Sequence, residues 1–257
     1  MSNLSDIGFP VKSDKDVNDI LMKVMQELTQ IPCPPRGFYY LFSDESGAEL
    51  FLQADSSQDI IGFNPAFWGK SRRKIGLLKG IERDTSELDG AFYGWSNPVD
   101  PEDPAEGGDH QIVFDMPDFR LHEKIILPKT AEVQLTAFAS NNFKIYENEA
   151  DLSKSRSGDA NDPARSFVAS ALFGLAENTP DQAGDAIPPQ AHGNISGEIK
   201  EFALRTNGFT HKTFYWFLID TLGGEIDIVA DPGLVTSEPK VGQIADGSFW
   251  ISGKILG

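Results

Sequence analysis

The sequence is poor in cysteine, with Cys33 as its single thiol in 257 residues. One thiol cannot form an intramolecular disulfide, so a packed core must hold the fold together. Hydrophobic residues make up 40% of the chain and aromatic residues 11%, which is enough for such a core. Cys33 lies between prolines with no histidine close in sequence, which favours an inert thiol over a nucleophile.

Basic residues are also scarce. The chain has 22 lysines and arginines against 39 aspartates and glutamates, a net charge of −17. Duplex DNA and anionic membranes require clustered positive charge, so we expect neither to bind measurably at physiological salt. No apolar run approaches the roughly 20 residues of a membrane-spanning helix, and the first residues lack a signal-peptide pattern. The sequence therefore predicts a soluble, acidic, cytoplasmic protein.

Motifs of the common reaction classes are missing as well. The chain has no Gly-x-Ser-x-Gly elbow for a nucleophilic serine. It has no phosphate-binding loop ending in Gly-Lys-Ser/Thr, and no Gly-x-Gly-x-x-Gly follows an expected strand. The sequence therefore identifies no reaction and predicts no cofactor.

Two similar stretches are present instead, 176 positions apart: "FYYLFSDESGAELFLQAD" at 38–55 and "FYWFLIDTLGGEIDIVAD" at 214–231. Seven of their eighteen aligned positions are identical. Each has an aromatic run, a polar turn with glycine, and an alternating strand that we expect to bury one face. Both stretches are predicted to be antiparallel hairpins, with Leu50, Leu52, Ile226 and Ile228 buried.

A second similarity follows each hairpin, between "LDGAFYGW" at 88–95 and "ADGSFWIS" at 245–252. Two related β domains are the simplest account, and convergence of ordinary strand-turn-strand units is the alternative. We therefore predict a mainly β protein of two related small barrel-like or sandwich-like domains with one N-terminal helix. The expected divisions are an N-terminal segment at 1–31, a first β domain at 32–124, and a second at 125–257 that contains a mobile polar segment near 151–192.

The pattern of apolar residues predicts further elements. Ser13 is a helix cap, and an amphipathic helix is expected from about Asp14 to Gln30, before the prolines. Strands are predicted near 132–139 and 143–147. A short helix is predicted over 163–175.

The C-terminal stretches "ISGEIKEFALRT", "KTFYWFLIDT", "GEIDIVAD" and "GQIADGSFWISGKIL" each predict a strand. This arrangement resembles a small OB-type barrel, whose missing strand residues 132–147 could supply. In addition, "LDGAFYGW", "VFDMPDF", "TLGGEIDIVADP" and "GSFWISGKI" resemble stretches of a family of uncharacterised bacterial β-rich proteins with no assigned activity. The resemblance implies a bacterial, cytoplasmic origin and lends no catalytic residues.

Alternation in the last strand separates Phe249 from Trp250. We expect one of them to anchor the C-terminal core, with Phe214 or Trp216 opposite. If Trp250 is the core residue, Trp250→Ala should cost roughly 3–5 kcal/mol of stability. If Trp250 lines a ligand groove, the cost should stay within about 1 kcal/mol and binding should be lost.

Four residues are candidate metal ligands: His110, Asp115, Asp118 and His122. Imidazole and carboxylate groups together bind zinc and similar ions. The spacing matches no closed zinc motif, however, and aspartate and histidine are ordinary residues at strand ends.

Other residues are candidates for ligand binding. Asp55 and Asp231 end equivalent strands of the two hairpins, where aspartate also commonly caps a turn. Trp68, Arg72 and Arg73 belong to the one basic cluster. Basic residues beside aromatic ones can hold single-stranded nucleic acid, or they can form a solvated turn.

The leading functional hypothesis is a non-enzymatic binding or scaffold protein. Its partner would be a protein or a small ligand, and its oligomeric state is left open. One alternative is a metal-dependent hydrolase that uses the acids and histidines of 109–123. The other is a weak binder of single-stranded nucleic acid through 67–79.

Overall fold

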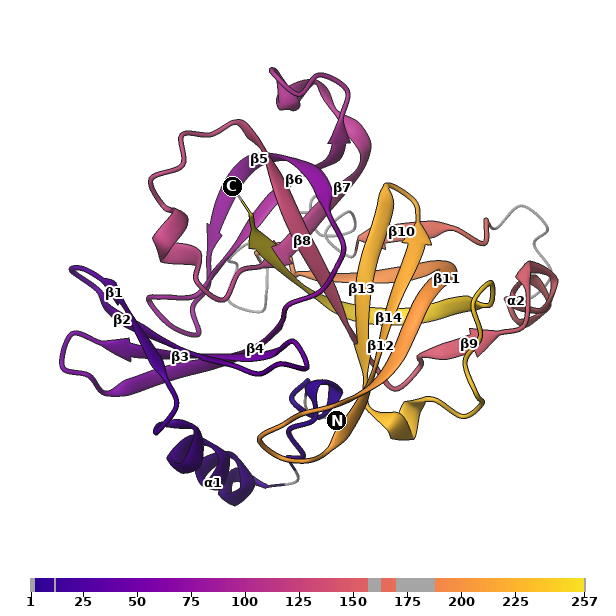
Figure 1. Cartoon of the computed structure of the whole chain (residues 1–257). Coiled ribbons are helices and arrows are strands. Elements are labelled where there is room, and N and C mark those ends of the chain that lie inside the picture. Colours follow the sequence, from indigo (N-terminus) through magenta and orange to yellow (C-terminus); the bar gives the residue numbers. More distant parts are fainter. Residues whose placement is uncertain (1–2, 12, 157–162, 170–187, 257) are drawn as a thin grey trace, which may run out of the picture.

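The computed structural model describes residues 3–11, 13–156, 163–169 and 188–256. The chain is mainly β, as the sequence predicts, and its strands form a small sheet and a larger barrel (Figure 1). In these ranges, no helix is long and apolar enough to span a membrane.

The small sheet is an antiparallel meander of four strands in the order β1-β2-β3-β4. Its strands are β1 (Thr29–Cys33), β2 (Gly37–Ser43), β3 (Ala48–Asp55) and β4 (Ile60–Phe67). A short 3₁₀ helix, η1 (Ser5–Ile7), and the helix α1 (Asp14–Val24) precede it. The hydroxyl of Ser13 accepts a hydrogen bond from the backbone N–H of Asp16, so the predicted cap is present.

The predicted helix is too long at its C-terminal end. It ends at Val24, and Thr29–Cys33 is a strand that pairs with β2. This pairing joins residues four to twelve positions apart across a turn, and a helical pattern of apolar residues does not report it. The buried side chains of Ile20 and Val24 nevertheless lie on one face of α1, as its periodicity predicts.

The larger body is a closed barrel of eight strands, in the ring order β11, β12, β13, β8, β5, β6, β7 and β14. Strand β14 pairs with β11 and closes the ring. The strands are β5 (Arg73–Glu82), β6 (Gly90–Pro98), β7 (Gly108–Asp115), β8 (Lys129–Ala139), β11 (His192–Thr206), β12 (Thr213–Thr221), β13 (Gly224–Ala230) and β14 (Ile244–Ile255). Short elements extend or connect them: η2 (Pro104–Glu106), η3 (Phe119–His122), β9 (Lys144–Tyr146), α2 (Glu149–Ser155), β10 (Ser166–Ala169) and η4 (Pro232–Leu234).

Strands β8 and β14 lie at opposite positions of the ring and also pair with each other. Their ladder divides the ring into two smaller rings, β5-β6-β7-β14-β8 and β11-β12-β13-β8-β14. Each smaller ring begins with a three-stranded antiparallel meander. The third strand of each meander then pairs in parallel with the last strand of the other half, β7 with β14 and β13 with β8.

This pairing gives β5–β8 and β11–β14 equivalent places in the strand order. Thr136 and Ser252 are cross-strand partners of each other. Their parallel partners are Asp227 for Thr136 and Asp115 for Ser252. Asp115 and Asp227 therefore occupy equivalent positions in the two halves.

The two similar hairpins do form, as β2–β3 and β12–β13, and their four marked aliphatic residues are buried. Their registers differ by one residue, with Phe38 opposite Ala54 but Tyr215 opposite Ala230. They also lie in different bodies, so the structural repeat relates residues 73–139 to 192–255 and not the hairpins to each other. The expectation that one face of each alternating strand is exposed is wrong, because β3 and β13 are covered on both faces.

Several other expected segments can be located in the structure. The strand expected within 132–147 is β8, which completes the C-terminal ring. The division expected at residue 124 falls between β7 and β8, two strands of the same barrel. The helix predicted over 163–175 is wrong at Ser166–Ala169, which pairs with β11, and its residues 170–175 lie outside the described ranges. The segment expected to be mobile, near 151–192, contains most of α2 and all of β10, and its residues 157–162 and 170–187 are not described.

The last strand separates its two aromatic residues, as alternation requires. Phe249 is fully buried in the barrel core against Phe143, while Trp250 is half-buried outside that core. Phe249 does not share a cluster with Phe214 and Trp216, whereas the partly buried Trp250 packs against the cluster that contains Phe214 and Trp216. Phe214 and Trp216 belong to the apolar layer between the barrel and the small sheet.

Candidate functional site

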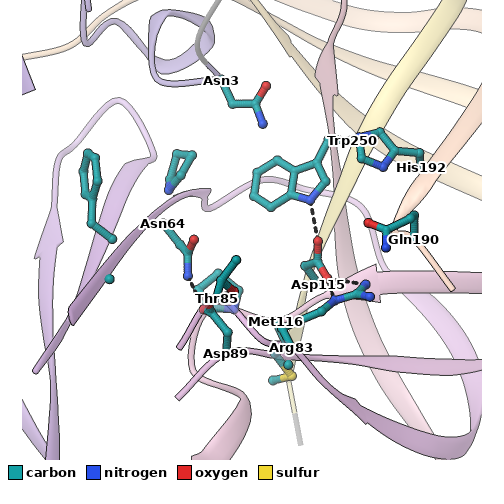
Figure 2. A pocket seen from close by; sticks show the side chains of 15 residues that line it. Asn3, Asn64, Arg83, Thr85, Asp89, Asp115, Met116, Gln190, His192 and Trp250 are labelled. Carbon is teal, nitrogen blue, oxygen red and sulfur yellow. Dashed lines mark hydrogen bonds and ion pairs between the residues drawn. The ribbon is translucent and has the colours of Figure 1, made fainter. Parts of the chain in front are cut away.

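A cleft of about 490 Å³ lies between the small sheet and one half of the barrel. Strand β4 supplies one wall through residues 62–65. The β5–β6 loop, the end of β7 and Trp250 of β14 supply the barrel wall, and residues 190 and 192 continue it. Asn3 lies at the edge of the cleft (Figure 2). The residues therefore come from six separate parts of the sequence.

Asp115 is the centre of the barrel wall. Its Oδ1 accepts hydrogen bonds from Nε and Nη2 of Arg83 at 2.9 and 2.7 Å. Its Oδ2 accepts a hydrogen bond from the indole Nε1 of Trp250 at 2.6 Å (Figure 2). Both members of the ion pair remain partly accessible, with side-chain exposures of 13% for Arg83 and 27% for Asp115. Asp115 thus fixes the orientation of the indole and the guanidinium while it keeps an open edge.

Asp89 joins the two walls. Its Oδ1 accepts hydrogen bonds from Nδ2 of Asn64 on β4 and Nε2 of Gln53 on β3, and its Oδ2 accepts one from Thr85. The next residue, Gly90, has no space for a side chain, because a Cβ there would lie 2.1 Å from the ring of Phe119. The turn before β6 is therefore fixed in position, and the small sheet is tied to the barrel across the cleft.

His192 lies at the far edge of the barrel wall. Partial burial lowers the pKa of its imidazole, the nearby charge of Arg83 lowers it further, and Asp115 raises it. The imidazole is therefore neutral at pH 7, with one nitrogen that donates and one that accepts.

The equivalent aspartate of the other half, Asp227, has a different environment. It is fully buried and accepts four hydrogen bonds. The donors are the backbone N–H groups of Lys70 and Ser71, Nε2 of Gln134, and the indole Nε1 of Trp216, at 2.7 to 3.0 Å. Asp227 thus holds the segment that connects the small sheet to β5.

Arg73, expected to bind a ligand, is only 2% exposed. Its guanidinium donates to the backbone carbonyls of Leu222, Gly224 and Glu225 at the β12–β13 turn. Burial lowers the pKa of Arg73 to about 10. These contacts are those of a side chain that stabilises a turn.

The four candidate metal ligands are dispersed. His110 is stacked on Phe167 at 4.2 Å between ring centroids, and burial lowers its pKa to about 4. Asp115 lies in the cleft, while Asp118 and His122 are 3.4 Å apart on η3. Over the residues that the structure describes, no group of three histidines, cysteines or carboxylates is arranged to hold a metal ion.

The remaining candidates lie outside the cleft. Asp55 and Asp231 each accept hydrogen bonds from the backbone of the turn that follows them. Trp68 is 42% exposed and lies between two cations, with Arg72 at 5.4 Å and Lys254 at 4.3 Å from the ring centroid. The residues that the sequence singled out thus contribute two cleft residues, Asp115 and Trp250.

Comparison with known proteins gives no relative. No protein family model, no curated protein and no solved structure matches the chain.

Proposed function

We propose that the protein is a non-enzymatic binding protein whose small ligand occupies the cleft between β4 and the barrel. The observation that carries this proposal is a pair of fixed polar centres that line one cleft: Asp115 with Trp250 on the barrel wall, and Asp89, which binds Asn64 of the opposite wall. Ligand sites characteristically combine a pocket of this size with a few well-oriented polar groups and an aromatic surface.

The strand order supports the same location. Strands β5-β6-β7-β8 followed by β14 have the order and the single parallel pair of an OB-type barrel, and we propose that relationship for both smaller rings. OB-type barrels bind their ligands beside strands 2 and 3 and the loop between strands 1 and 2. The cleft lies at the corresponding loop, through Arg83, Thr85 and Asp89. This is an analogy of fold and carries no ligand identity.

A comparison of the two halves of the barrel also supports a ligand site beside the β5–β6 loop. In the other half, the β11–β12 turn contacts the N-terminal segment, through Asn207 to the carbonyl of Ile7 and Thr210 to that of Gly8. In that half, the N-terminal segment therefore occupies the position that corresponds to the cleft.

The two alternatives have weaker support. A hydrolase that uses 109–123 would need its candidate ligands together, and they are apart. A nucleic-acid site at 67–79 would lose Arg73, which is buried, although Trp68 and Arg72 remain at the surface. We retain the predictions of a bacterial, cytoplasmic protein that does not bind duplex DNA.

A thermal-shift screen of a metabolite library tests the proposal with three proteins: wild type, His192→Ala and Trp95→Ala. His192 lines the cleft and Trp95 does not. We expect compounds that raise the melting temperature of wild type and Trp95→Ala but not that of His192→Ala. If every stabilising compound acts equally on all three proteins, the cleft is not the binding site.

A further inference from the structure

The cleft has a charge that selects against anions. Among its lining residues, the charged groups are Arg83, Asp89 and Asp115, which sum to −1 with His192 neutral. Arg83 is already paired with Asp115. A phosphate or carboxylate ligand would therefore add its charge to a lining of net charge −1, whose only cation is already paired.

The same groups can both donate and accept further hydrogen bonds. Arg83 uses three N–H groups, two toward Asp115 and one toward the carbonyl of Pro189, and a guanidinium has five. Oδ2 of Asp115 accepts from Trp250 and keeps a second lone pair. Neutral His192 adds one donor and one acceptor. A ligand that matches this wall must both donate and accept at closely spaced atoms.

The wall also has an apolar surface of fixed orientation. The indole of Trp250 is held by Asp115 on its edge and packs against Phe138 at 4.8 Å between ring centroids. Figure 2 shows the indole in the middle of the cleft residues, between Asn3, His192 and Asp115. Phe63 of β4 adds a half-buried ring on the opposite wall. A ligand ring with one apolar face can stack there while its edge meets the polar groups.

We propose that the ligand is a neutral carbohydrate, whose pyranose ring lies on Trp250 and whose hydroxyl groups bind Asp115, Arg83 and His192. Hydroxyl groups both donate and accept, carry no charge, and project from the edge of a ring that has an apolar C–H face. This inference rests on the proposed binding function of the cleft and specifies its ligand class. Cationic metabolites and peptides are competing ligand classes that the experiment separates.

The test uses a glycan array that displays neutral, sialylated and sulfated oligosaccharides, probed with the full chain. The expected result is binding to neutral glycans, with the dissociation constant of the best glycan at least about tenfold larger for Trp250→Ala and for His192→Ala. Trp95→Ala should bind as wild type does. His192→Ala removes an exposed ring, so it keeps the test valid if Trp250→Ala fails to fold.

A second measurement separates the two proposals. The metabolite screen described above is run with non-carbohydrate compounds on the same variants. If the array is negative and a cation or peptide binds in a His192-dependent manner, the carbohydrate inference is overturned and the binding function stands. If neither the array nor the screen gives binding that depends on His192, both are overturned. Preference for sialylated or sulfated glycans would also overturn the inference, because the charge argument would be wrong.

Discussion

Two aspartates at equivalent positions of the barrel, Asp115 and Asp227, differ in what surrounds them. Each accepts a hydrogen bond from a tryptophan indole, Trp250 for Asp115 and Trp216 for Asp227. Asp227 is covered by the segment before β5 and is fully buried, whereas Asp115 remains partly exposed in a cleft. The same strand arrangement thus places a buried structural aspartate, Asp227, in one half and an accessible aspartate, Asp115, in the other.

The largest expected effect comes from removing the two carboxylates. Asp227→Ala leaves four donors without this acceptor, three of them in buried hydrogen bonds, so we expect a loss of roughly 3–5 kcal/mol in the free energy of unfolding. Asp115→Ala exposes its former donors to solvent in the cleft, and we expect a loss of about 1–2 kcal/mol. Urea denaturation of both variants measures the difference. Equal losses would mean that the two aspartates have the same role.

The tryptophans sharpen the same comparison. Trp216 is 3% exposed between the barrel and the small sheet, so Trp216→Ala should cost roughly 3–5 kcal/mol. Trp250 is half-buried, and Trp250→Ala should cost about 1–2 kcal/mol and abolish ligand binding. Denaturation midpoints, measured with a binding assay, test both statements. A midpoint for Trp250→Ala as low as that of Trp216→Ala would assign Trp250 to the core.

The N-terminal segment packs on the half of the barrel that contains Asp227, and the stability that its residue Asp6 contributes should fall at high pH. Burial raises the pKa of Asp6 to about 8, the N–H of Asp231 lowers it, and the charge of Asp231 raises it. The folded pKa lies above the unfolded value, so the stability that Asp6 contributes is fully present below about pH 4 and is lost as pH rises through 8. Asp6→Asn should therefore be more stable than wild type at pH 9, by thermal denaturation. Parallel pH profiles of the two proteins would contradict this.

The smallest effect is expected from Arg72→Ala, which removes an exposed side chain of the segment that covers Asp227. Asp227 binds the backbone of Lys70 and Ser71, so the basic side chains around them are not needed for the contact. We expect Arg72→Ala to change stability by less than about 0.5 kcal/mol and to leave ligand binding unchanged. A gel-shift assay with single-stranded DNA can use this variant, whereas Arg73→Ala would remove a buried side chain. Strong binding that Arg72→Ala abolishes would favour the nucleic-acid alternative.

The sequence predicts the strands of this fold well because their patterns are local. The alternating aliphatic residues of 49–53 and 225–229 identify two strands whatever they pack against. The end of α1 is predicted wrongly because Thr29–Cys33 is a strand only through its pairing with β2. The burial of both faces of β3 likewise depends on the contact between the small sheet and the barrel, which no local pattern encodes.

The repeat and the site are harder to predict from the sequence. Asp115 and Asp227 are equivalent through strand pairing, but their flanking residues, "VFDMPD" and "EIDIVA", differ. Arg83 and Asp89 are two charged loop residues among the many of this acidic chain, and only the fold brings them opposite Asn64. Alternation did separate Phe249 from Trp250, and together with the choice of Asp115 as a candidate ligand it pointed to the cleft.

Indole N–H resonances measure the central claim most directly, because the four tryptophans give separate signals that Trp→Phe variants assign. Titration with a ligand found in the screen or on the array is followed by ¹H–¹⁵N correlation spectra. If the ligand binds in the cleft beside Asp115 and not in the half that contains Asp227, the Trp250 signal shifts with ligand concentration and the Trp216 signal stays in place. A ligand that leaves the Trp250 signal unchanged, or that shifts the Trp216 signal instead, would contradict the account.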